Sequence, residues 1–168
     1  MELFHGSNKT IEKPDICHTR KNGGKDFGEG FYLTGELKMA KNFAAKVVKR
    51  SNSGEASVSA YEVRLDNLHT CQLKIKKFSE PSPEWFVFVY ENRTKTKGTH
   101  EYDIVIGPVA DNGLPEKIAE YERAVREERE IDLRHFANAI NYHHYPNTYQ
   151  YCFRSEEALT LLRYIPRL

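Results

Sequence analysis

Short apolar and aromatic runs, separated by polar loops, constrain the fold of this chain more than any other feature. Apolar side chains alternate with polar ones at Tyr61, Val63 and Leu65, and again at Leu73 and Ile75. This alternation is typical of half-buried strands. Nearly continuous runs of β-branched and aromatic residues predict further strands at 2–5, 31–33, 85–90, 102–106 and 149–153.

Fewer segments have helical spacing. Thr34 can cap a helix whose inner face carries Leu37, Ala40, Ala44, Val47 and Val48. Pro115 suits a first helical position, so a charged helix is expected over 116–130, followed by a helix with apolar spacing from Leu133 to Ile140. Ser155 can cap a short final helix. Strands early and late with helices between them predict an α+β fold with a mainly antiparallel sheet.

Composition sets broad limits on the class of protein. The 168 residues suit one domain spanning 1–168, and neither a repeat nor a linker divides them. No apolar run approaches the roughly 20 residues of a membrane span, and no secretory signal is visible, so we expect a cytoplasmic protein. The three cysteines, without a CxxC pair, argue against a disulfide framework and a zinc site. A net charge of +1 gives no global attraction to nucleic acid, and the group Lys74, Lys76 and Lys77 fits a solvated strand face.

The first candidate motif is Leu3-Phe4-His5-Gly6-Ser7, in which an apolar strand delivers a histidine and then a glycine. Because glycine has no Cβ, a flat ligand can approach its backbone and pair with both N–H and C=O. The histidine can donate to a ribose hydroxyl. Taken alone, a His-Gly pair at a strand end is more often an ordinary turn.

The second candidate motif runs from Asp26 to Thr34, with Gly28 and Gly30 before an aromatic strand. The glycines permit a tight turn, and Tyr32 can offer its ring as a stacking platform. A dinucleotide GxGxxG pattern fails because Leu33 stands where the third glycine belongs, and no GxxxxGK[ST] phosphate loop exists.

The third candidate is Gln150, an amide flanked by aromatic residues on the last predicted strand. By itself it is better explained as a glutamine that faces water from an edge strand.

Together, the three segments resemble the ADP-ribosyltransferase superfamily, in its poly-ADP-ribose-polymerase-like branch with a His-Tyr-Glu triad. Leu3 to Ser7 and Phe27 to Leu33 match the two early blocks of that branch, in the same order. The resemblance implies two small, mainly antiparallel sheets that form a split β core with flanking helices. It also implies NAD⁺ as substrate, with no metal.

The resemblance also implies roles for individual residues. His5 and Ser7 would contact the dinucleotide, and Gly6 would clamp the nicotinamide carboxamide through its backbone. Tyr32 and Phe43, which lies eleven residues further on, would enclose the nicotinamide ring. Arg20, in the loop expected to cover the dinucleotide, is a candidate for the pyrophosphate because a guanidinium suits phosphate oxygens. A serine that the branch uses for the carboxamide is replaced by Ala40.

Gln150 stands where the triad glutamate aligns, which is a departure from the pattern. A glutamine keeps hydrogen bonds and loses the charge that stabilises an oxocarbenium ion, so we expect single ADP-ribose transfer rather than chain elongation. The resemblance extends to a bacterial group of domains in which a glutamine strand is followed by Phe-x-(Ser/Thr)-Glu-x-(Ala/Ser)-Leu, here Phe153 to Leu159. Restoring the charge with Gln150→Glu is expected to raise NAD⁺ glycohydrolysis.

Three functions therefore stand at this stage. The first is a mono-ADP-ribosyltransferase with catalytic His5, Tyr32 and Gln150, which modifies a protein or nucleic-acid acceptor. As a bacterial toxin or defence effector it would have an antitoxin or immunity partner, and no membrane. The others are a catalytically silent NAD⁺ or ADP-ribose binding module and a protein-interaction domain. Adjacent His143 and His144 lack a third ligand and fit a solvated loop better than a metal site.

Overall fold

The computed structural model describes residues 1–16, 25–64, 72–95, 100–110, 113–141 and 148–166. Its strands are β1 (Glu2–Ser7), β2 (Phe31–Thr34), β3 (Ser57–Val63), β4 (Ile75–Lys77), β5 (Ile104–Pro108), β6 (Tyr149–Phe153) and β7 (Leu162–Ile165). Its helices are α1 (Leu37–Ser51), α2 (Pro83–Thr94), α3 (Leu114–Arg126), α4 (Leu133–Ile140) and α5 (Glu156–Leu159). The α+β class predicted from the sequence is confirmed.

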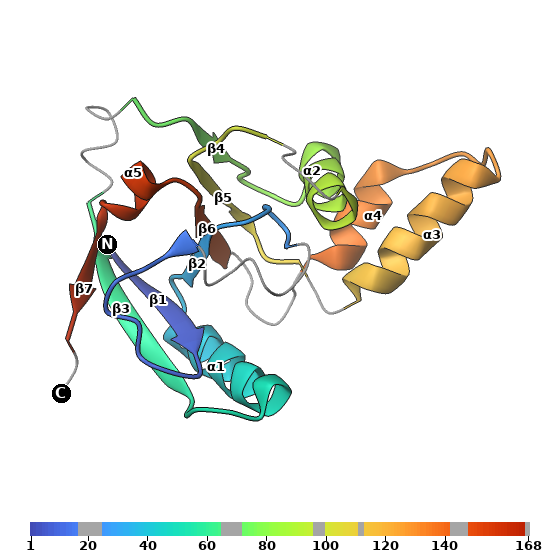
Figure 1. The fold of residues 1–168 in the computed structure, drawn as a ribbon. Helices are drawn as coiled ribbons and strands as arrows, with labels where there is room; N and C mark the ends of the chain where they lie inside the picture. The colour runs from blue at the N-terminus through green and yellow to red at the C-terminus, as the bar shows by residue number, and fades with distance from the viewer. Residues whose placement is uncertain (17–24, 65–71, 96–99, 111–112, 142–147, 167–168) are drawn as a thin grey trace.

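The strands form one mixed sheet in the order β4-β5-β6-β2-β1-β3-β7. β4 and β5 run parallel, and the other neighbouring strands run antiparallel, as predicted. The expectation of two separate sheets needs correction, because β1 and β2 are joined. Their register contains a single pair, Phe4 with Thr34, so the two halves of the sheet meet along a very short seam. α1 lies against the β1–β3 half, and α2, α3 and α4 lie together beyond β5 (Figure 1).

The segment 85–90 is a helix, and the prediction of a buried strand there was wrong. Ser82 precedes α2 and its side chain accepts a hydrogen bond from the backbone N–H of Trp85 at 3.2 Å, while Pro83 occupies the first turn. Trp85, Phe86 and Val89 are fully buried. A helix that is apolar on most sides has no alternation to distinguish it from a buried strand, so the aromatic content was misleading.

Other boundaries differ at the ends of helices. Glu36, and not Thr34, precedes the first residue of α1, and its side chain makes no capping bond. Thr34 instead accepts a hydrogen bond from the backbone N–H of Glu36 at 3.2 Å. α3 ends at Arg126, short of the predicted 130. Ser155 caps α5 as predicted, accepting from the N–H of Ala158.

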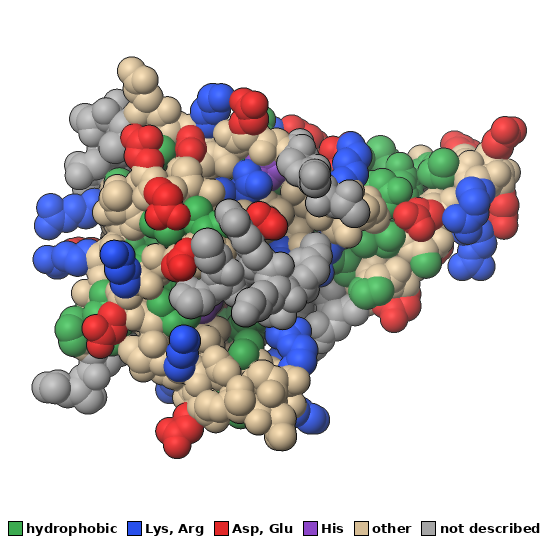
Figure 2. All heavy atoms as spheres, in the orientation of Figure 1, with side chains coloured by type: hydrophobic (Ala, Val, Ile, Leu, Met, Phe, Trp, Pro, Cys, Tyr) green, Lys and Arg blue, Asp and Glu red, His purple; other side chains and the backbone are tan. Residues whose placement is uncertain are grey.

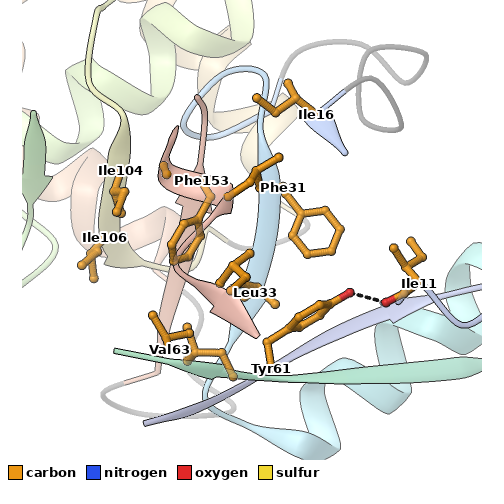
Figure 3. Close-up of a cluster of buried hydrophobic side chains, with 13 residues drawn as sticks. Ile11, Ile16, Phe31, Leu33, Tyr61, Val63, Ile104, Ile106 and Phe153 are labelled. Carbon is orange, nitrogen blue, oxygen red and sulfur yellow. Dashed lines mark hydrogen bonds between the residues drawn. The ribbon is translucent and has the colours of Figure 1, made fainter. Parts of the chain in front are cut away.

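The core occupies both faces of the sheet, because alternate side chains of the central strands point to opposite sides. One face carries Phe31, Leu33, Tyr61 and Phe153, whose side chains converge in Figure 3. There the hydroxyl of Tyr61 donates to the carbonyl of Ile11 and ties the segment after β1 to β3. The other face packs against α2 and α4 through the cluster Phe27, Trp85, Phe86, Val105, Phe136 and Cys152.

Lys, Arg, Asp and Glu side chains are interspersed over the face seen in Figure 2, and they crowd the outer end of α3. None of the helices in the described segments combines the length and apolar character needed to cross a bilayer.

Candidate functional site

A cavity of about 990 Å³ opens beside the seam between β1 and β2. The residues predicted from the sequence that line it are His5, Gly6, Ser7, Tyr32, Phe43 and Gln150. They come from β1, β2, β6 and α1, so the fold brings together residues up to 145 positions apart. Arg20 lies outside the described residues.

The backbone of Gly6 points toward the seam. Met1 and Val63 exchange two backbone hydrogen bonds, at 2.9 and 2.8 Å, which fixes the alternation along the β1–β3 ladder. Every second residue of β1 therefore bonds to β3, and the intervening residues, Phe4 and Gly6, direct N–H and C=O the other way. Phe4 meets Thr34 of β2 there. The β1–β2 pairing stops at that point, so the polar groups of Gly6 face the place where the strands separate.

The reason for a glycine at position 6 differs from the one expected. A Cβ on Gly6 would lie 2.1 Å from the carbonyl oxygen of Ala40 and 2.9 Å from the backbone nitrogen of Ala44. The missing side chain thus admits the backbone of α1, and not a ligand, at close range. What Gly6 presents to the cavity is its peptide edge at the seam.

The ring of His5 is held in one orientation. Its Nδ1 lies 2.8 Å from the carbonyl oxygen of Tyr32, and it stacks on Phe31 with ring centroids 4.3 Å apart. Because a carbonyl only accepts, Nδ1 carries the proton, and in the neutral ring Nε2 is an acceptor. The contact with Tyr32 thus fixes the side of the ring that faces β2.

Tyr32 is fixed at its hydroxyl and offers its ring. The hydroxyl donates to the carbonyl of Gly28 at 2.6 Å and accepts from the N–H of Phe27 at 3.1 Å. Burial raises the pKa of the Tyr32 phenol well above its ordinary value. Gly28 has φ +80°, a conformation that glycine adopts without strain. The ammonium of Lys25 lies 5.3 Å from the centroid of the Tyr32 ring. Burial lowers the pKa of Lys25.

Phe43 is an exposed aromatic residue on the wall of the cavity. It projects from α1 with 43% of its surface exposed, so its ring has room to contact a ligand. Ser7, at the end of β1, makes a 3.5 Å contact from its hydroxyl to the Asn8 side-chain oxygen.

Gln150 belongs to a buried polar network. Its Nε2 donates to Oδ2 of Asp26 at 2.8 Å and to the carbonyl of Pro108 at 3.2 Å. Asp26 is 6% exposed, and its Oδ1 accepts from Nε and Nη2 of Arg93 at 2.9 and 2.6 Å. The structure thus places a carboxylate in the cavity wall beside Gln150.

Asp26 was missed as a functional residue in the sequence. It opens the second motif, so its position was noted, but its partner stands 124 residues away. The only signal in the sequence was an acidic residue beside the Phe-Gly-x-Gly block. That signal does not indicate a contact with Gln150 until β2 and β6 are known to be neighbours.

The cavity wall is rich in cations. Its basic residues are Lys9, Lys25, Lys46, Arg50 and Arg93, whereas its acidic residues are Asp26 and Glu122. This excess is large for a chain whose net charge is +1, and it favours an anionic ligand. The described residues therefore offer several partners for a diphosphate besides the predicted Arg20.

His100 supports the loop that carries Asp26 and Gly28. Its Nε2 donates to the carbonyl of Phe27 at 3.1 Å, and its Nδ1 accepts from Arg154 at 3.1 Å and from the N–H of Tyr102 at 3.2 Å. Burial, followed by the charge of Arg154, lowers the pKa of His100 to about 4. The ring is neutral near pH 7 and holds the loop to the end of β6.

Of the remaining sequence candidates, His143 and His144 lie outside the described residues. Within the described segments no three His, Cys, Asp or Glu side chains are grouped as metal ligands would be. Lys74 pairs with Glu101, and Lys76 with Glu84, as for a solvated strand face. Cys152 is a fully buried core residue, and burial raises the pKa of its thiol to about 12.

Fold and cavity together define an α+β domain with a cationic, aromatic-lined cleft at a seam in its sheet. The chain belongs to the family described as protein of unknown function (DUF3990), which matches residues 1–164. Neither the curated proteins nor the solved structures contain a match.

Proposed function

We propose that this protein is an NAD-dependent mono-ADP-ribosyltransferase that releases nicotinamide and modifies a protein or nucleic-acid acceptor. The observation that carries the proposal is the convergence of His5, Gly6, Tyr32, Phe43 and Gln150 on one cavity. These residues were selected from motifs far apart in the sequence. The cavity volume of about 990 Å³ lies at the upper end of the roughly 300–1,000 Å³ range for ligand sites.

The chemistry of the wall suits the parts of NAD⁺. The peptide edge of Gly6 matches a carboxamide, which needs one donor and one acceptor. The exposed Phe43 ring and the Tyr32 ring suit a flat nicotinamide, and the His5 imidazole suits a ribose hydroxyl. The cations Lys46 and Arg50 on α1 suit the diphosphate.

In the proposed reaction the bond between C1′ of the ribose and the pyridinium nitrogen breaks. Its electron pair stays with nicotinamide, which leaves neutral, and a cationic oxocarbenium-like ribose remains. A lone pair of the acceptor then forms the new bond at C1′, and the acceptor releases a proton to solvent. Since cationic charge develops at the ribose, negative charge placed in advance near it accelerates the reaction.

The finer fold assignment, an ADP-ribosyltransferase fold, is part of this proposal. It is supported by the short seam between β1 and β2 and by the position of α1 against β1. A split β core would open at such a seam, and the cavity lies there.

A second candidate is a catalytically silent NAD⁺ or ADP-ribose binding module. The neutral amide of Gln150, with both its protons donated to protein acceptors, favours it. The transferase binds NAD⁺ and breaks its glycosidic bond, whereas the module binds NAD⁺ or ADP-ribose and breaks no bond.

Two measurements test these candidates. Excess NAD⁺ is expected to raise the melting temperature, since a ligand that binds only the folded state stabilises it. Nicotinamide release is then followed with and without lysate, and mass spectrometry with labelled NAD⁺ identifies the acceptor. Stabilisation without any release would support the silent module. No stabilisation by either NAD⁺ or ADP-ribose would exclude both candidates and favour an interaction domain. Tyr32→Ala is the site control and is expected to lose NAD⁺ binding.

A further inference from the structure

We propose that Asp26 acts through Gln150 as a positioning residue, and that this pair supplies the hydrogen-bond acceptor and negative charge of the transfer site. The inference rests on the proposed function. It concerns how a site without an acidic residue at position 150 stabilises a cationic ribose.

The orientation of the Gln150 amide follows from its partners. The two groups facing its terminal atom are the carboxylate of Asp26, at 2.8 Å, and the carbonyl of Pro108, at 3.2 Å. Both only accept hydrogen bonds, so the atom between them must be the nitrogen. Both amide protons are thereby committed, and the polar atom left for a ligand in the cavity is the carbonyl oxygen Oε1.

Gln150 therefore meets a ligand as an acceptor, as a carboxylate would. Without Asp26 the amide could turn over and present its protons to the cavity, which would repel a developing cation. Asp26 is itself fixed by two hydrogen bonds from Arg93. The orientation of Oε1 is thus set by a chain of three side chains from the 26–34 block, α2 and β6.

Asp26 also places a negative charge one hydrogen bond away from the Gln150 amide. Its carboxylate lines the same cavity and is 6% exposed, so water screens it little. A carboxylate bonded to an amide proton polarises that amide and increases the negative charge on its oxygen. Arg93 offsets part of this charge, although its own side chain is 37% exposed and better screened.

The experiment compares nicotinamide release from NAD⁺, with water as acceptor, in the full chain and four variants. Asp26→Asn removes the charge and should lower kcat about 10- to 100-fold with little change in KM. Asp26→Asn combined with Gln150→Glu moves the charge to the other member of the pair. It should restore kcat to within about fivefold of wild type, because one carboxylate again accepts from one amide.

Gln150→Met covers the case in which Asp26→Asn does not fold. It keeps the Asp26–Arg93 ion pair and removes the carbonyl acceptor, so kcat should fall as far as expected for Asp26→Asn. The matched control is Glu29→Gln, which makes the same charge change in the same loop at an exposed residue outside the cavity wall. Its kcat should equal that of wild type.

The outcomes separate the two hypotheses. A wild-type chain that releases no nicotinamide overturns the proposed function, and this inference falls with it. Normal release by wild type together with an unchanged kcat in Asp26→Asn or in Gln150→Met overturns the inference alone. The same follows if the combined variant is as slow as Asp26→Asn. Loss in both single variants and recovery in the combined variant supports it.

Discussion

The side-chain nitrogen of Gln150 donates to the carboxylate of Asp26 across 2.8 Å, although 124 residues separate them in the sequence. Gln150, which lacks the charge that a glutamate would carry at this position, is therefore in direct contact with a buried carboxylate. This contact changes the meaning of the glutamine, because its nitrogen donates to Asp26 and Pro108 and its oxygen is the polar atom left for a ligand.

The first prediction concerns Gln150→Glu, which the sequence alone suggested would be faster. Next to Asp26 the new carboxylate would face a like charge and would lose the amide proton that Asp26 accepts, so repulsion offsets the gain in charge. Nicotinamide release is then expected to stay within about threefold of wild type. An increase of tenfold or more in a steady-state assay at pH 7 would contradict this prediction.

The second prediction concerns the packing of α1 on β1. Gly6→Ala places a Cβ within 2.1 Å of the Ala40 carbonyl, which is a backbone atom that moves only with the helix. We expect the free energy of unfolding to fall by about 3 kcal/mol, the upper end of the usual cost of overpacking. Urea denaturation followed by Trp85 fluorescence measures it.

Gly35→Ala is the matched control for Gly6→Ala. A Cβ there meets nothing within 4 Å, so its effect should stay within about 0.5 kcal/mol. Equal stability of the two variants would mean that α1 does not pack on Gly6 in this way.

The third prediction separates binding from stability at Phe43. Because its ring is 43% exposed, Phe43→Ala should change the melting temperature little. It should weaken NAD⁺ binding by about 1–3 kcal/mol, the usual loss when an aromatic platform under a flat base is removed. Isothermal titration calorimetry measures the affinity for NAD⁺. Val125→Ala, at an exposed apolar residue of α3 outside the cavity, should bind NAD⁺ as wild type does, and equal affinity in both variants would refute the stacking role.

The fourth prediction concerns the diphosphate. Arg50 lines the cavity near the end of α1, whereas its neighbour Lys49 does not. Arg50→Met is expected to weaken NAD⁺ binding by about 1.5–3 kcal/mol, as for a lost hydrogen bond to a charged group. The affinity should also depend less on salt. Lys49→Met removes a positive charge from the same turn, and identical losses in both variants would mean that only the overall field matters.

The site could be predicted from the sequence where its chemistry is local. His5 and Gly6 are adjacent, and Tyr32 follows its glycines at once, so each block could be interpreted within a few residues. The reason why position 6 requires a glycine could not be predicted, because it depends on where the backbone of α1 lies. The Asp26–Gln150 contact could not either, since it requires the neighbouring positions of β2 and β6, which no local pattern encodes.

The fold was predictable to a similar extent. β6 and the cap of α5 are determined by nearby residues and were predicted at their observed positions. α2 was not predicted as a helix. Its residues Trp85 and Phe86 are buried in the cluster between the sheet and the helices, and burial on most sides removes the periodicity that distinguishes a helix. The two halves of the sheet are joined by one residue pair between β1 and β2, Phe4 with Thr34. A pairing this short produces no recognisable pattern in the sequence of either strand.

The last prediction concerns the dependence of stability on pH through His100. Its pKa is about 4 in the folded chain and about 6.5 when unfolded. The unfolded chain therefore binds a proton at a pH where the folded chain does not. The stability that neutral His100 contributes is complete above about pH 6.5 and is lost as the pH falls toward 4.

His100→Gln should remove this component. The difference in unfolding free energy between wild type and His100→Gln is thus expected to be largest at pH 7 and to shrink steadily toward pH 4.5. His135, exposed on α4, provides the control variant His135→Gln. Urea denaturation of the three proteins at several pH values checks the prediction. A difference that stays constant for His100→Gln across this range would mean that His100 does not hold the Phe27 loop as a neutral ring.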